Sequence, residues 1–369
     1  MPKAAWRQLL EEQGFSDAIA IPAATDHPVL LQQAVLLARA PPVPAIDAAS
    51  ARWLIIPDAG GVAEALSSKL TARGDTVRIG PATSALQGWL TSALREPWGG
   101  VIHMAGLDTA LDESASLATL QSGQEHGVGS ALITAQILAT QTRATAKLWF
   151  VTRGAQATSA GEAPDAGQAT IWGLSHVVAL EHPELNCRRI DLDPEASADA
   201  AADALTAELA SAGREDQIAL RAGRRLVRRL ASYAPSSARS APMKLHPERS
   251  YLVTGGLRGL GLRVAEWLVQ NGARHLALMG RRGVDTRAEA ALDRMRQAGA
   301  TILVISGDVG SAPDVKRAFA EIGDALPPLA GVIHSAGTLA DAVIGKQSWS
   351  RFATVFGPKV SGTWLLHTL

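Results

Sequence analysis

The segment from residue 251 to 261, Tyr-Leu-Val-Thr-Gly-Gly-Leu-Arg-Gly-Leu-Gly, constrains the fold more than any other part of the chain. Its first residues are apolar and predict a buried strand, which the glycines after Thr254 break. The residues that follow place Leu262, Ala265 and Leu268 on one face of a helix. A strand, a glycine turn and a helix in this order predict a parallel α/β unit whose helix N-terminus faces the phosphates of a dinucleotide.

The glycines of this turn have separate roles in such a site. Gly255 and Gly259 can adopt backbone angles that other residues avoid, which lets the chain approach a pyrophosphate. Gly261 allows the helix to pack closely on the strand. A glycine turn of this kind also occurs without a ligand, so the motif alone leaves both interpretations open.

Three later strands end in residues that suit the rest of a dinucleotide. They are Arg281 and Arg282 after the strand at 276–280, Asp308 and Val309 after the strand at 301–305, and Ser335, Ala336 and Gly337 after the strand at 331–334. Arginines at the first position suit a 2′-phosphate, whereas an acid there suits a ribose hydroxyl. The carboxylate of Asp308 can reach an adenine amino group. Because doubly wound sheets bind ligands at the carboxyl ends of their strands, these residues predict one site.

An internal repeat predicts a second unit of the same kind earlier in the chain. Residues 52–61 resemble residues 250–259, and residues 100–106 resemble residues 331–337. The interval between the second strand and the next repeated strand is much shorter in the first copy, which leaves no room for a helix, a strand and a helix. Ile56, Pro57 and Ala63 stand where the second copy has Thr254, Gly255 and Gly261. Proline removes an amide donor, so the first unit is predicted not to bind nucleotide.

Composition excludes several classes of function. Lysine plus arginine and aspartate plus glutamate number 35 each, so no net charge favours nucleic acid or an anionic membrane. Cys187 is the only cysteine, which excludes an internal disulfide and a cysteine-rich metal site, and no metal is predicted. The chain has neither a signal-peptide core at its start nor a long apolar run, which predicts a cytoplasmic protein without a membrane partner.

Taken together, Thr-Gly-Gly-x-x-Gly-x-Gly, the arginine pair, Gly-Asp-Val and His-Ser-Ala-Gly resemble the ketoreductase domain of a modular type I polyketide synthase, a member of the short-chain dehydrogenase/reductase superfamily. The run Phe-Gly-Pro-Lys-Val-Ser-Gly-Thr-Trp-Leu-Leu-His at 356–367 strengthens the resemblance, which covers residues 50–369. Lys359 takes the place of the family's catalytic lysine. We expect it on a helix that continues to His367, with Pro358 in the first turn.

The resemblance implies NADPH-dependent reduction of a β-ketoacyl thioester to a β-hydroxyacyl thioester. The substrate would be carried on the phosphopantetheine of an acyl carrier protein, and neighbouring synthase domains would be the other partners. The cofactor residues are expected to be Thr254, Gly255, Gly256, Gly259, Leu260, Gly261, Arg281, Arg282, Asp308, Val309, Ser335, Ala336 and Gly337. Leu339 and Asp341 are expected to guide the substrate. The order Leu-Ala-Asp, where one class of ketoreductase carries Leu-Asp-Asp, leans towards a D-configured hydroxyl.

The proton donor of the family is expected beyond this sequence. In the family a serine and a tyrosine follow the lysine, and this chain stops at Leu369. Tyr251 lies in the predicted strand and Tyr233 borders a linker, so neither suits the role. We therefore expect the isolated chain to be inactive, either as a fragment of a complete ketoreductase or as one piece of a split one.

The predicted fold class is α/β, with two Rossmann-like doubly wound units. The first is truncated and degenerate, and the second is nucleotide-binding and cut short at the C-terminus. The predicted domains are a remnant at 1–40, a ketoreductase structural subdomain at 41–233, a linker at 234–248 and the N-terminal part of the catalytic subdomain at 249–369. The remnant, with a helix at 6–15 and strands at 18–21 and 29–39, resembles the C-terminal end of a C-methyltransferase.

Two features of the first unit have plain structural interpretations. Trp172-Gly-Leu and Glu181-His-Pro fit the structural subdomain and are expected to serve packing and helix termination. Five arginines crowd a predicted hairpin around Gly223, where a solvated strand face and an anion site are both open. Two other functions also remain open at this point. The chain can be a non-catalytic structural or docking piece of a synthase, or an unrelated short-chain dehydrogenase with a duplicated fold.

Overall fold

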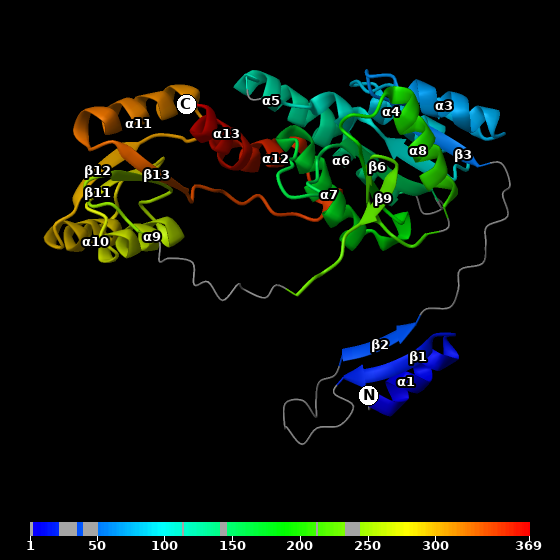
Figure 1. The fold of residues 1–369 in the computed structure, drawn as a ribbon, viewed down its shortest axis with the longest axis horizontal. Helices are drawn as coiled ribbons and strands as arrows, with labels where there is room; N and C mark the ends of the chain where they lie inside the picture. Colours follow the sequence, from blue (N-terminus) through cyan, green and yellow to red (C-terminus); the bar gives the residue numbers. More distant parts are fainter. Residues whose placement is uncertain are drawn as a thin grey trace. The chain divides into compact units, whose positions relative to one another are not determined.

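Two parallel sheets form the larger of the two units into which the chain divides (Figure 1). The computed structural model describes residues 3–21, 35–39, 51–112, 114–140, 146–211, 213–232 and 244–369. The units are Met1–Ala49 and Ser50–Leu369. The predicted boundaries after residues 40 and 233 fall on or beside residues outside the described ranges, so the domain limits remain predictions.

The smaller unit contains one helix and one hairpin. Helix α1 (Lys3–Glu12) is followed by Gly14, whose φ of +82° permits the turn into β1 (Ser16–Ile21). Strand β2 (Val35–Arg39) pairs with β1 in antiparallel fashion. The predicted helix and strand pair are confirmed for the described residues, whereas the first part of the second predicted strand, at 29–34, lies outside them.

A seven-stranded sheet corresponds to the first predicted unit. Its order is β4-β3-β5-β6-β7-β8-β9, and every neighbouring pair is parallel except β8 with β9. The strands are β3 (Arg52–Ile56), β4 (Thr76–Ile79), β5 (Gly100–His103), β6 (Lys147–Arg153), β7 (Arg188–Leu192), β8 (Gln217–Arg221) and β9 (Arg224–Val227). Strand β4 is the edge strand of this sheet. The unit therefore lacks a further strand outside β4, as the short interval between the second and the next repeated strand predicted.

Helices cover both faces of this sheet. Helices α3 (Val62–Ala72) and α8 (Ala198–Ala210) pack on one face. Helices α4 (Leu86–Ala93), α6 (Ser130–Thr140) and α7 (Ala166–Glu181) pack on the other, and α5 (Leu117–Gln124) runs into α6 through a π-helical turn at Glu125–Gly129. Short 3₁₀ turns lie at Ala105–Thr109 and Pro183–Leu185. The alternation of strand and helix with two apolar layers is that of a doubly wound fold.

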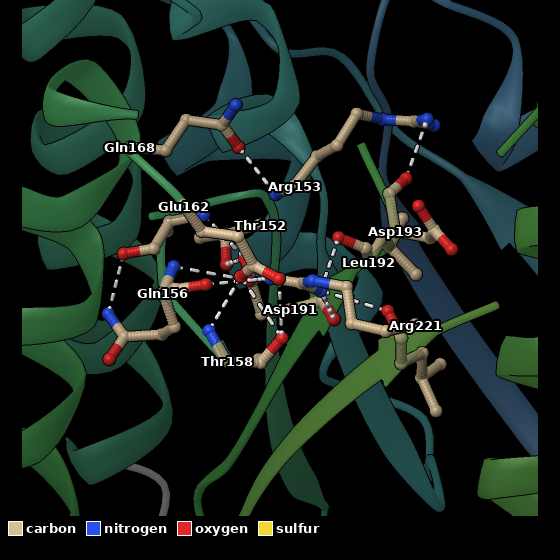
Figure 2. Close-up of polar contacts among 12 residues, drawn as sticks. Thr152, Arg153, Gln156, Thr158, Glu162, Gln168, Asp191, Leu192, Asp193 and Arg221 are labelled. Atoms are coloured by element: carbon tan, nitrogen blue, oxygen red, sulfur yellow. Dashed lines mark hydrogen bonds and ion pairs between the residues drawn. The ribbon is translucent and has the colours of Figure 1, made fainter. Parts of the chain in front are cut away.

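Three of the five arginines in and beside the hairpin formed by β8 and β9 pair with acids. Arg221 donates to the fully buried Asp191 at 2.5 Å, and Asp191 also accepts hydrogen bonds from Thr152 Oγ1 and from the backbone of residues 155 and 156 (Figure 2). Arg225 and Arg229 pair with Glu208 and Glu215. A buried charge needs such partners, so this network serves the fold and does not favour an anion site.

The second sheet has four parallel strands in the order β12-β11-β10-β13. They are β10 (Ser250–Thr254), β11 (His275–Gly280), β12 (Thr301–Ser306) and β13 (Leu329–His334). Helices α9 (Gly259–Gln270) and α10 (Thr286–Gln297) cover one face and α11 (Ala312–Ala325) the other (Figure 1). The predicted apolar face of α9 is buried against this sheet, as the helical spacing required.

The C-terminal helix differs from the prediction. Helix α12 (Trp349–Phe356) continues through a π-helical turn at Gly357–Ser361 into α13 (Gly362–Thr368), so Pro358 does not begin a helix. Trp349, Phe352 and Phe356 lie on one side of α12 and pack against the core of the seven-stranded subdomain. This packing extends the helix upstream, and the wider turn accommodates the proline that lacks an amide donor.

Candidate active site

A cleft of about 280 Å³ lies where the four parallel strands of the second sheet end. The register aligns Thr254 with Met279 and His334, so the residues that follow these strands meet at one edge. All of the predicted cofactor residues except Gly256 line this cleft. Gly256 sits behind the loop, where a Cβ atom would lie 2.7 Å from the Val253 carbonyl oxygen.

The backbone of the glycine loop requires glycine. Gly255 has a φ of +68°, and a Cβ there would lie 2.8 Å from the carbonyl oxygen of Ser335. A Cβ at Gly261 would overlap the Gly255 carbonyl oxygen. Gly259 has a φ of +49° and nothing within 4 Å, so its side towards the cleft is open. The residues present therefore fit a cofactor whose pyrophosphate approaches the backbone closely.

Charged side chains from the glycine turn and from the ends of β11 and β12 line the cleft. The Arg281 Nη1 atom is 3.6 Å from Asp308 Oδ2, and both side chains are about half exposed. Arg258, which sequence analysis did not assign, also lines the cleft and pairs with Asp285 at 3.1 Å. Its position inside the glycine turn was the available signal. Arginine side chains of this kind form charge-assisted bonds with phosphate.

The side chain of Lys359, on the π-helical turn, lies beside Gly337, which lines the cleft. A Cβ atom on Gly337 would lie 3.0 Å from Lys359 Cε and 3.2 Å from Lys359 Nζ. Pro358, the preceding residue, lines the cleft. The lysine and the small-residue turn after β13 are therefore neighbours, although they are 22 positions apart in the sequence.

His334 joins the glycine loop to this turn. Its Nε2 atom lies 2.8 Å from the Pro358 carbonyl oxygen, which only accepts, so Nε2 is the donor in this bond. Its Nδ1 atom forms a second hydrogen bond, 2.6 Å long, with Thr254 Oγ1. Thr254 Oγ1 also accepts from the amide of Ala336 at 3.4 Å. This chain of hydrogen bonds connects three segments of the site, and sequence analysis treated His334 only as the end of a strand.

Comparisons with known proteins agree with this arrangement. Residues 249–369 match the family described as KR domain, and residues 100–230 match the Rossmann fold domain of the polyketide synthase extender module SpnB. A solved structure described as A-type ketoreductases from a modular polyketide synthase is 30% identical, with a TM-score of 0.73 over 88% of this chain and 70% of that chain. The chain belongs to the ketoreductase domains of modular polyketide synthases.

Curated relatives of this ketoreductase are much longer proteins. The 5-methyl-1-naphthoate synthase of Streptomyces sahachiroi is 34% identical over 60% of this chain, which spans 13% of that synthase. The polyketide synthase GfsA of Streptomyces halstedii is 32% identical over 82% of this chain, which spans 4% of that synthase. The family assignment excludes the alternative of an unrelated short-chain dehydrogenase with a duplicated fold.

The structural subdomain of the ketoreductase fills its own equivalent of the nucleotide site. Asp58 follows β3, and its carboxylate accepts hydrogen bonds from the amides of Val62 at 3.2 Å and Ala63 at 2.8 Å. Asp108 Oδ1 accepts from the Ala59 amide at 2.8 Å. These carboxylates occupy two amides at the start of α3 and one amide before it, donors that a phosphate would otherwise use. The degenerate character predicted from Pro57 has this physical basis.

The two residues predicted to guide the substrate lie outside the cofactor cleft. Leu339 is 83% exposed and Asp341 is also exposed, in the segment between β13 and α12. Neither lines the cleft, and their role stays a prediction. Their position is that of a surface loop leading away from the Gly337 turn.

No tyrosine lines the ketoreductase cleft among the residues that the structure describes. Tyr251 is buried in β10, and its hydroxyl accepts a hydrogen bond from the His246 amide at 2.8 Å. Tyr233 lies outside the described residues. The expectation that Tyr251 is not a proton donor agrees with this location.

The described part of the chain shows neither a metal cluster nor a membrane span. Within those ranges, His, Cys, Asp and Glu side chains form no group of three or more suited to a metal ion. Every helix in the same ranges is too short or too polar to cross a bilayer.

Proposed function

We propose that this ketoreductase binds NADPH in the cleft of the four-stranded sheet. The bound cofactor serves the reduction of a β-ketoacyl thioester, carried on an acyl carrier protein, to a β-hydroxyacyl thioester. The observation that carries the proposal is the meeting of the glycine loop, the arginine pair and the Gly337 turn at one cleft, with Lys359 beside that turn. NADPH supplies the hydride when bound.

Each part of the cleft has a role in the proposal. The loop from Thr254 to Gly261 would hold the pyrophosphate, because its glycines leave the backbone open on the cleft side. Arg281 and Arg282 would bind the 2′-phosphate. Lys359 would place a positive charge beside the developing alkoxide and the group that donates its proton.

Cofactor preference tests this proposal. A charge-assisted contact with the 2′-phosphate is worth roughly 1–3 kcal/mol, so NADPH should bind about tenfold or more tightly than NADH. Titration calorimetry of the chain with each nucleotide measures this ratio. The double substitution Arg281→Ala, Arg282→Ala should weaken NADPH binding and leave NADH binding nearly unchanged.

Arg296→Ala is the matched control, because this arginine lies at the far end of α10 and pairs with Glu289 and Asp293. It should leave both affinities unchanged. Equal affinity of the wild-type chain for the two nucleotides would contradict the assignment of the arginine pair. Failure to bind either nucleotide would instead favour a structural or docking role for this part of the synthase.

A further inference from the structure

One residue of the catalytic subdomain, Ile344, is held on three sides by the structural subdomain. Its side chain is 2% exposed and belongs to the hydrophobic core of the seven-stranded sheet. Its amide donates to Glu181 Oε2 at 2.7 Å, and its carbonyl oxygen accepts from Gln136 Nε2 at 2.8 Å. Gln136 lies on α6 and Glu181 ends α7. The main chain and the side chain of Ile344 are therefore both fixed by elements outside its own subdomain.

The hold extends along the chain to the residues around Asp341. Gln136 Nε2 also donates to the carbonyl oxygen of Gln347 at 2.8 Å. The side chain of Gln347 in turn donates to the carbonyl oxygens of Ala340 at 3.3 Å and Ala342 at 3.1 Å. These bonds fix the backbone on both sides of Asp341. The side-chain amide of Gln136 thus donates both of its hydrogens, one to Ile344 and one to Gln347, and so anchors this end of the loop.

The loop at 338–343 has little packing of its own. Leu339 and Val343 are 83% and 56% exposed, and Asp341 is exposed. A segment without buried side chains opens easily, so its conformation is set by the points that anchor its ends. One end is the Gly337 turn beside Lys359, and the other is the segment from Ile344 to Gln347.

We propose that Gln136 and Glu181 of the structural subdomain are positioning residues for the loop at 338–343. Through this loop, which carries Leu339 and Asp341, they determine how the β-keto substrate enters the cleft. The inference rests on the proposed function for its substrate and on the predicted guiding role of Leu339 and Asp341, and it gives a role to Glu181, which sequence analysis assigned to helix termination. The structural subdomain then contributes to substrate orientation as well as to stability.

Hydrogen–deuterium exchange of the chain tests the hold directly. Gln136→Ala removes both bonds to the loop anchor, so amides at 338–348 should exchange about tenfold faster. Glu181→Ala should accelerate the Ile344 amide, and Glu181→Gln should restore its protection because an acceptor oxygen remains. Glu184→Ala is the control, because Glu184 follows α7 closely in the chain and its carboxylate pairs with His182 rather than with the loop anchor.

The outcomes separate this inference from the proposed function. NADPH affinity should stay within about twofold in every variant, because none of these residues lines the cofactor cleft. Unchanged exchange at 338–348, or equal acceleration at 254–261, would overturn the inference. If the wild-type chain does not bind NADPH, the proposed function is rejected, while the exchange experiment still shows whether Gln136 and Glu181 hold the loop.

Steady-state kinetics provide the functional test, measured in a preparation of the protein that reduces a β-ketoacyl thioester. Gln136→Ala should raise the KM for the thioester or change the ratio of the two hydroxyl configurations, with the KM for NADPH unchanged. A merely structural role would lower activity without changing either quantity. An unchanged thioester KM together with an unchanged product ratio would contradict substrate positioning.

Discussion

Single glycines carry the geometry of the nucleotide loop. Gly261 and Ala63 occupy equivalent places in the two units, yet only Ala63 has room for a methyl group. At Gly261 a Cβ atom would collide with the carbonyl oxygen of Gly255. The loop around Gly261 therefore cannot hold its present conformation with a methyl group at this position.

Gly261→Ala should abolish measurable NADPH binding, because relief of the collision must move the loop that surrounds the pyrophosphate. Calorimetric titration checks the loss, and circular dichroism verifies that the sheet remains folded. Gly323→Ala is the control, since a Cβ at Gly323 in α11 meets nothing within 4 Å. Retained NADPH affinity in the Gly261 variant would show that the cofactor binds elsewhere.

The buried His103 makes stability depend on pH. Burial lowers its pKa to about 3, with the charge of His126 as the second cause, and its Nε2 atom lies 2.8 Å from Ser130 Oγ. Below about pH 6.5 the unfolded chain binds a proton that the folded chain excludes. The free energy of unfolding should therefore decrease as pH falls from 6.5 towards 3, by up to about 1.4 kcal/mol per pH unit from this group.

His103→Gln removes the titrating group and keeps a polar side chain of similar size. Denaturant unfolding between pH 6.5 and 4.5 should give a shallower pH dependence for this variant than for the wild type. Identical slopes for the two proteins would contradict a neutral buried imidazole.

At the scale of elements, the two glycine-loop helices differ in what occupies their N-termini. The first two amides of α3 donate to the carboxylate of Asp58, which is 6% exposed. The residue before α9, Arg258, makes no side-chain hydrogen bond that caps the helix. Gly259, Leu260 and Gly261 at the start of α9 line the cleft, whereas Asp58 accepts from two amides of α3. The same supersecondary unit therefore opens to a cleft in one subdomain and is capped by a carboxylate in the other.

Asp58→Ala should lower the free energy of unfolding by about 1–2 kcal/mol, because two amides at the start of α3 lose their acceptor. NADPH affinity should not change. Thermal or denaturant unfolding measures the first quantity and calorimetry the second. An unchanged or raised free energy of unfolding in the variant would contradict the role assigned to Asp58.

Local patterns predicted the elements well and their long-range contacts poorly. The strands at 250–254 and 329–334 and the buried face of α9 were recognisable because apolar spacing and glycine breaks are local signals. The extent of α12 was missed because the aromatic stripe of Trp349, Phe352 and Phe356 is stabilised by a distant core. The prediction for Pro358 failed for the same reason, since proline usually begins a helix rather than lying inside a π-helical turn.

At the scale of the whole molecule, the catalytic subdomain depends on contacts that no sequence pattern marks. Gln136 contacts Ile344 across 208 positions, and the Trp364 indole donates to the Ala115 carbonyl oxygen at 3.1 Å across 249. Hydrogen bonds to backbone atoms require no particular residue type in the partner. The residues that line the cleft were therefore predictable from local patterns, while the contacts of Gln136 with Ile344 and of Trp364 with Ala115 were not.

The central claim is that one of the two related units binds nucleotide and the other does not. Calorimetric titration of the chain with NADPH measures this most directly through its stoichiometry. We predict one NADPH per chain, with a preference over NADH that disappears in the Arg281→Ala, Arg282→Ala variant. Two equivalents per chain, or one equivalent that survives Gly261→Ala, would contradict the assignment of the site to the four-stranded subdomain.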